Sequence, residues 1–95
     1  MVKGVTSKEE TIIKEILKEY PYEFYYYGSR VKGDYTKSSD LDILIKSDTP
    51  IPTLIMNELS TKFNKSKIPY IVNFSEFNLL EDKFFKHIQP TLVKI

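Results

Sequence analysis

One stretch in the first half of the chain combines a glycine turn with two closely spaced aspartates, and it constrains the fold most. Residues Tyr22–Tyr27 are mostly aromatic and carry no helix signal, which predicts a buried strand that ends at Gly28. Residues 29–40 are rich in Ser, Gly, Asp, Lys and Thr, which indicates a turn or short helix followed by a loop. Residues 41–46 predict a second strand with two faces: Leu41, Ile43 and Ile45 on one, and Asp40, Asp42 and Leu44 on the other.

The remaining elements follow from helical and strand-like spacing. A Ser-x-x-Glu capping box at Ser7 predicts a helix over about residues 8–19, which Pro21 stops. Residues 54–63 predict a second helix, and residues 68–74 a third strand. A third helical stripe runs over residues 77–88, and residues 91–95 form a short strand or a loose tail. We therefore expect an α/β (α+β) fold, in which a small mixed sheet has its helices mainly on one face. The opposite face near Asp40 and Asp42 would stay open for a substrate.

Composition narrows the class of protein. The 95 residues suit a single domain, 1–95, and 41% hydrophobic with 28% charged residues is typical of a soluble globular protein. A net charge of +1 gives no basic signature of a dedicated nucleic-acid-binding domain, so nucleic acid is not expected as the primary partner. The absence of cysteine excludes disulfides, thiolate zinc sites and a Cys nucleophile. No apolar run is long enough for a signal or a membrane span, which predicts a cytoplasmic protein.

The central stretch carries residue types suited to a metal-bound phosphate. Asp40 and Asp42 alternate on a strand, roughly 6–7 Å apart, and can direct oxygens at a common point. Mg²⁺ prefers such oxygen ligands, together with substrate phosphates and water. Gly28 lets a phosphate approach the backbone, the Ser29 hydroxyl can donate to it, and Arg30 and Lys32 can neutralise its charge. An Asp-x-Asp pair alone is common in surface turns. The combination with Gly-Ser favours phosphate or metal binding.

Other polar and aromatic residues have simpler interpretations. Tyr20, Tyr22, Tyr25, Tyr26 and Tyr27 could stack on a base, although packing beside a core is the more common role of strand tyrosines. His87 suits the last turn of the third helix as a dipole or capping residue. Lys37 and Lys46 could extend the positive field around a triphosphate, or be solvated surface lysines.

The sequence resembles the minimal nucleotidyltransferases of the DNA polymerase beta-like nucleotidyltransferase superfamily, which are kanamycin nucleotidyltransferase-like. The likeness lies in the residues Gly28-Ser29-Arg30-Val31-Lys32-Gly33 and Ser39-Asp40-Leu41-Asp42-Ile43-Leu44-Ile45. It implies a polymerase beta-like fold, a nucleotide held by Gly28, Ser29, Arg30 and Ser39, and Mg²⁺ held by Asp40 and Asp42. The implied reaction transfers AMP from ATP to a hydroxyl of a partner protein or another acceptor. The resemblance further implies a HEPN-type partner, as in toxin–antitoxin pairs where the nucleotidyltransferase is the antitoxin, or a homo-oligomer.

One position departs from the pattern of that family. The third carboxylate is expected on the strand after the second helix, and the matching residue here is Asn73. Asn can offer a carbonyl oxygen to a metal, but it is neutral and cannot act as a general base. Glu76, three residues further along the strand, would point to the opposite face unless the strand had already ended. The catalytic set is therefore Asp40, Asp42 and Asn73. The alternative is a catalytically impaired nucleotide-binding module that regulates or masks a partner protein.

Overall fold

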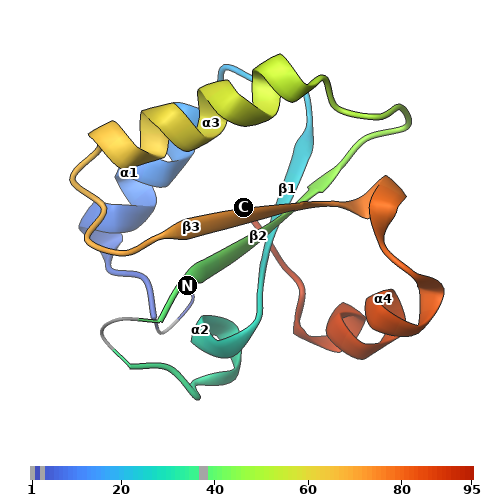
Figure 1. Ribbon diagram of the computed structural model, residues 1–95. Coiled ribbons are helices and arrows are strands. Elements are labelled where there is room, and N and C mark those ends of the chain that lie inside the picture. Colours follow the sequence, from blue (N-terminus) through green and yellow to red (C-terminus); the bar gives the residue numbers. More distant parts are fainter. Residues whose placement is uncertain (1, 3, 37–38) are drawn as a thin grey trace.

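The computed structural model describes residues 2, 4–36 and 39–95, and its centre is a four-stranded mixed sheet (Figure 1). The strands lie in the order β3-β2-β1-β4. Their bounds are Glu23–Tyr27 for β1, Leu41–Lys46 for β2, Val72–Glu76 for β3 and Val93–Lys94 for β4. β1 is antiparallel to both β2 and β4, whereas β3 is parallel to β2. The α/β (α+β) class is confirmed, and β2 has the predicted bounds. Lys37 lies outside the described residues.

One face of the sheet is covered by α1 (Ser7–Leu17) and α3 (Thr53–Lys65), which lie side by side in Figure 1. The main core lies between these helices and the strands, and its fully buried members include Ile13, Leu41, Ile43, Ile45 and Leu59. The capping box of α1 is one residue earlier than predicted. Thr6 Oγ1 accepts from the Glu9 backbone N–H, and the Glu9 carboxylate accepts from that of Thr6. The threonine hydroxyl can accept from the free backbone N–H at the start of the helix as well as a serine hydroxyl can. Thr6 is therefore the N-cap, and Ser7 belongs to the first turn of α1.

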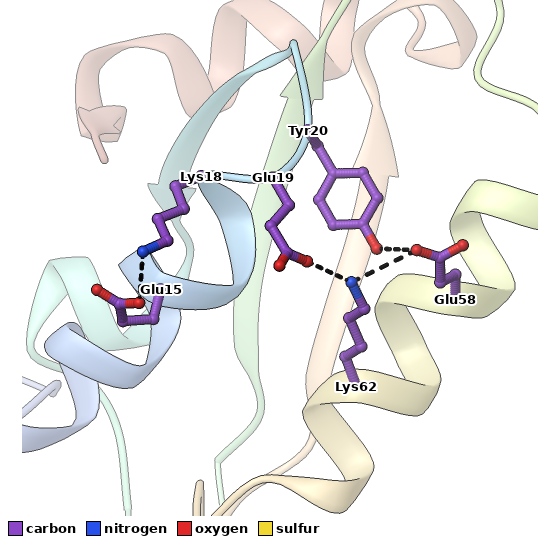
Figure 2. Close-up of polar contacts among 6 residues, drawn as sticks. All are labelled: Glu15, Lys18, Glu19, Tyr20, Glu58 and Lys62. Carbon is purple, nitrogen blue, oxygen red and sulfur yellow. Dashed lines mark hydrogen bonds and ion pairs between the residues drawn. The ribbon is translucent and has the colours of Figure 1, made fainter.

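A polar network joins the end of α1 to α3 (Figure 2). The Tyr20 hydroxyl donates to the Glu58 carboxylate over 2.5 Å, and Lys62 Nζ lies 2.6 Å from a Glu19 carboxylate oxygen. Lys62 also lies 3.4 Å from Glu58. The Glu19 carboxylate and the Tyr20 hydroxyl raise the pKa of Lys62. Exposed ion pairs of this kind contribute little to stability.

The opposite face of the sheet is partly covered by the C-terminal helix α4 (Asp82–Ile88), on the other side from α1 and α3 (Figure 1). A second apolar cluster forms there around the buried residues Tyr27, Leu44 and Ile88. The helices therefore lie mainly on one face, as expected. The opposite face was expected to stay open, but α4 covers part of it. None of the helices in the described part of the chain is long and apolar enough to cross a membrane.

The C-terminal third differs from the sequence prediction in conformation. β3 begins at Val72 instead of residue 68 and continues to Glu76, whose carboxylate accepts from the Ile51 backbone N–H at 2.8 Å. The predicted helix over 77–88 is divided into a 3-10 turn, Phe77–Leu79, and α4, because Leu80 and Glu81 are extended. A second 3-10 turn, Gln89–Thr91, leads to β4. Of the two alternatives for residues 91–95, a short strand or a loose tail, the structure shows the strand.

Candidate active site

Gly28 links β1 to the short helix α2 (Ser29–Lys32) and packs directly against Asp42. Its φ of 86° and ψ of −158° fall in a region that is essentially restricted to glycine. A Cβ built at this position would collide with the Asp42 carboxylate, because the preceding residue, Tyr27, is the register partner of Asp42. The glycine turn and the aspartate predicted for phosphate and metal binding are therefore neighbours in space.

The other two members of the predicted catalytic set lie beside Asp42. The parallel register of β2 and β3 sets Asn73 opposite Asp42, on the face away from α1 and α3. The Asn73 side-chain amide donates to Asp40 Oδ2 over 2.8 Å. Burial raises the pKa of Asp42, the Asp40 charge raises it further, and the Asn73 amide opposes that rise. The structure thus brings together Asp40, Asp42 and Asn73 at one end of the two strands.

Arg30 is directed into the protein, although it was predicted to neutralise the charge of a bound phosphate. Its side chain is only 4% exposed, and its Nε and Nη2 donate to the Ser39 carbonyl over 3.0 and 2.9 Å. Nη1 donates to the Gly4 carbonyl, and the guanidinium lies 3.8 Å from the centre of the Tyr70 ring. Arg30 therefore holds the backbone that precedes Asp40. Direct contact of Arg30 with a nucleotide stays a prediction.

Ser39 takes part in the same loop. Its hydroxyl accepts from the Thr36 backbone N–H over 2.9 Å, while its carbonyl receives the Arg30 side chain. Its placement fixes the approach of the chain to Asp40. A nucleotide contact of Ser39 likewise stays a prediction.

Next to Asp42, the structure shows a group of side chains around Tyr27, for which the sequence indicated no functional role except stacking on a base. Tyr27 spans from β1 to β3, where its hydroxyl lies 2.7 Å from Ser75 Oγ. Burial raises the pKa of Tyr27, the hydrogen bond to Ser75 opposes that rise, and the charge of Asp42 adds to it. The Phe84 ring of α4 meets the Tyr27 ring edge-on, with centroids 6.5 Å apart. Ser75 had a signal in the sequence, since it shares a strand face with Asn73, whereas the contact of Phe84 with Tyr27 had none.

The donor set at this site fits a hard divalent cation. The described residues contain no cluster of three or more His, Cys, Asp and Glu side chains, so the oxygens available are those of two carboxylates and the Asn73 amide. Mg²⁺ accepts such a set when substrate phosphates and water complete its coordination. The Asp40 charge that raises the Asp42 pKa is a repulsion that a cation would relieve. Asp40, Asp42 and Asn73 therefore suit Mg²⁺.

Comparison with known proteins shows the family of the chain. A family model described as a nucleotidyltransferase domain matches residues 9–93, which includes every residue of the candidate site. The chain belongs to the nucleotidyltransferase family. A relative from Haemophilus influenzae, named "Probable protein adenylyltransferase MntA", is 33% identical over 93 residues, which cover 96% of this chain and 82% of the relative.

A solved structure supports the fold of this nucleotidyltransferase. The crystal structure of a "putative nucleotidyltransferase" from Sulfolobus solfataricus superposes with a TM-score of 0.51 and 21% identity. The match covers 90% of this chain and 73% of that protein. The predicted membership of the nucleotidyltransferases and the predicted fold are both confirmed.

Proposed function

We propose that this nucleotidyltransferase uses Mg²⁺ to transfer AMP from ATP to a hydroxyl group of a partner protein, with release of pyrophosphate. The observation that carries the proposal is the packing of Gly28 against Asp42, with Asp40 and Asn73 alongside. In this arrangement the glycine turn can bind the phosphates of a nucleotide. The neighbouring carboxylates can bind the cation that accompanies the same triphosphate. The name of the Haemophilus influenzae relative, a probable protein adenylyltransferase, supports AMP and a protein acceptor.

Each residue of the site has a role in this proposal. Gly28 and Ser29 bind the triphosphate, whereas Asp40, Asp42 and Asn73 hold Mg²⁺. The bound cation would neutralise charge that develops on the phosphates during transfer. Arg30, through the Ser39 carbonyl, keeps Asp40 in position. The acceptor oxygen replaces pyrophosphate on the α-phosphorus, and its proton passes to solvent because the neutral Asn73 cannot accept it.

The partner in this proposal is a HEPN-type protein, and the chain acts as the antitoxin of a cytoplasmic toxin–antitoxin pair. The support for a protein as the acceptor is the name of the Haemophilus influenzae relative, a probable protein adenylyltransferase. A homo-oligomer in which one copy modifies another is the other arrangement compatible with a hydroxyl acceptor.

Asn73 favours a second candidate function, a nucleotide-binding module that masks or regulates its partner without turnover. The amide that donates to Asp40 occupies the position of the third carboxylate and adds no negative charge. Such a site would bind nucleotide and metal while lacking a base for the acceptor hydroxyl.

Calorimetry with ATP and Mg²⁺, followed by transfer of labelled AMP to the partner, tests both functions. We expect binding and transfer in the natural protein, and loss of transfer in Asp40→Ala and Asp42→Ala. Asp48→Ala, in the exposed loop after β2, is the matched control and should behave as the natural protein does. Tight binding without transfer would favour the regulatory module. Absence of both nucleotide and metal binding would reject both functions.

A further inference from the structure

An exposed aromatic ring borders the candidate active site and has no role in the proposal above. Phe84 lies in α4 and is 43% exposed, although it belongs to the apolar stripe of the C-terminal segment. Its ring meets Tyr27 at an interplanar angle of 85°, so one part of the ring is packed and another part is open to solvent. Large apolar side chains left open beside a site are candidates for ligand contact.

The two adjacent phenylalanines of α4 point toward opposite ends of β2. Phe85 packs edge-on against Phe77, with ring centroids 4.9 Å apart, and with Lys46 it lines a small cavity at the end of β2 away from the carboxylates. Phe84 instead contacts Tyr27, the register partner of Asp42. Phe84 is therefore the ring of this helix that faces the carboxylate end of the sheet.

The support beneath Phe84 is fixed in place. Tyr27 is buried, and its hydroxyl bonds to Ser75 on β3, so its ring spans the sheet face next to Asp42. Tyr27 is also the residue that precedes Gly28, so the ring that supports Phe84 is adjacent to the phosphate turn in the backbone. A phenylalanine side chain has only two rotatable torsions, so Phe84 can stack on a flat partner at a small cost in side-chain entropy.

We infer that Phe84, supported by Tyr27, forms the stacking surface for the base of a purine nucleoside triphosphate. The inference rests on the proposed function, since it takes the phosphates to lie at Gly28 and Ser29. The base of such a nucleotide extends from the phosphates by about the length of one nucleoside, and Phe84 is the exposed ring that the structure places beside Tyr27. Stacking on one ring favours a purine over the smaller pyrimidine, and it does not read the edge of the base.

The chain contains no tryptophan, so Phe84→Trp introduces a single fluorescent reporter at the proposed surface. With Mg²⁺ present, ATP should quench this fluorescence, CTP should quench it less at equal concentration, and inorganic tripolyphosphate should leave it unchanged. Leu54→Trp is the matched control. Leu54 is 74% exposed on α3, on the opposite side of the sheet, and its reporter should not respond to any of the three.

Affinity measurements on the natural protein and on three further variants complete the test. Phe84→Ala and Phe84→Leu should weaken ATP binding by about fivefold or more, because a stacked aromatic ring is lost, while tripolyphosphate binds as before. Phe84→Tyr should restore the natural affinity. Circular dichroism shows whether each variant is folded, and the Leu variant keeps most of the apolar contact with Tyr27.

The outcomes separate this inference from the proposed function. If the natural protein binds ATP but Phe84→Ala binds it equally well, the stacking inference is wrong and the proposed function stands. If Phe84→Ala changes only the KM for the protein acceptor, the ring contacts the acceptor and the inference is also wrong. If the natural protein binds neither ATP nor tripolyphosphate, the proposed function fails together with the inference.

Discussion

Gly28 and Gly33 flank α2, and both have positive φ angles, of 86° and 90°. A Cβ at Gly28 would collide with the Asp42 carboxylate, whereas a Cβ at Gly33 would meet nothing within 4 Å. We expect Gly28→Ala and Gly33→Ala each to lose about 1–3 kcal/mol of unfolding free energy from backbone strain. Only Gly28→Ala should also lose ATP and Mg²⁺ binding. Chemical unfolding and calorimetry on the pair check this, and equal binding losses in both variants would contradict it.

Asp42 should reduce the stability of the metal-free protein at neutral pH. Burial and the Asp40 charge raise its pKa above the ordinary carboxyl value of 3.8, so its ionised form is less favourable folded than unfolded. The free energy of unfolding therefore falls as the pH rises through the interval above 3.8, and the loss is complete above the pKa of the folded state.

Asp42→Asn removes that cost. With EDTA present, we expect its Tm to exceed that of the natural protein by a few degrees at pH 7, with the difference vanishing below pH 3.8. Asp48→Asn, in an exposed loop, controls for the loss of one negative charge and should show no such gain. A metal-free Asp42→Asn variant less stable than the natural protein at pH 7 would refute the electrostatic account.

Asn73 reduces repulsion at the site, because its amide donates to Asp40 and carries no charge. In Asn73→Asp that donor is lost and a third negative charge is added. We expect the metal-free variant to be less stable, its Mg²⁺ affinity to rise on the order of tenfold, and AMP transfer to increase. Calorimetry with Mg²⁺ measures the affinity. Asn64→Asp, exposed on α3, is the matched control, and an unchanged Mg²⁺ affinity in Asn73→Asp would place the third position elsewhere.

At the scale of elements, α2 is too short to be stable alone, and its position depends on Arg30. The guanidinium donates to carbonyls on two separate segments, at Gly4 and Ser39. Lysine keeps the charge but lacks the planar fork, so Arg30→Lys should leave one of these carbonyls without its partner. We expect a loss of about 1–3 kcal/mol in urea unfolding.

The same variant separates the positioning role of Arg30 from a nucleotide contact. Lys32→Met, on the exposed side of α2, removes a charge from this helix without disturbing the two carbonyls. It should retain the natural stability. Arg30→Lys with natural stability but weakened ATP binding would show that Arg30 contacts the nucleotide instead of holding the loop.

The C-terminal segment shows where sequence patterns predict burial better than conformation. One helix was predicted from the spacing of Phe77, Leu80, Phe84, Phe85 and Ile88. All of these side chains except the exposed Phe84 gather in one cluster with Tyr27 and Leu44. They do so from a 3-10 turn, an extended residue and a short helix. β3 extends to Glu76, whose side chain bonds to the loop before α3, and this contact from a distant segment overrides the local helical spacing.

The candidate site shows the same division. Asp40 and Asp42 could be predicted because period-two alternation places them on one strand face, and Asn73 because the resemblance to the nucleotidyltransferases marks its position. The contacts of Tyr27 with Ser75 and Phe84 could not be predicted, because they depend on how β1, β3 and α4 meet around β2. The burial of the Arg30 side chain could not be predicted either, because its partners Gly4 and Tyr70 are distant from it in sequence.

At the scale of the whole molecule, the candidate site lies between the well-packed main core and the weakly packed helix α4. Leu59 and Phe63 of α3 are buried in the main core, whereas Ile88 is the one fully buried residue among the seven of α4. We expect backbone amides of β1 and β2 to exchange most slowly with solvent, α3 next, and α4 markedly faster. Hydrogen-exchange mass spectrometry measures these rates. Equal protection of α3 and α4 without nucleotide would contradict the expected order.

The two residues of β4 affect how the protein can be made in the cell. Val93 and Lys94 provide the pairing of β1 on the side away from β2, and they come almost seventy residues after it along the chain. Until β4 has been synthesised, the backbone donors and acceptors on this edge of β1 have no strand to pair with. The side chains of β1 include three consecutive tyrosines. Open strand edges of this kind are sites of aggregation. A ribosome that stalls before residue 93 would therefore release an aggregation-prone chain.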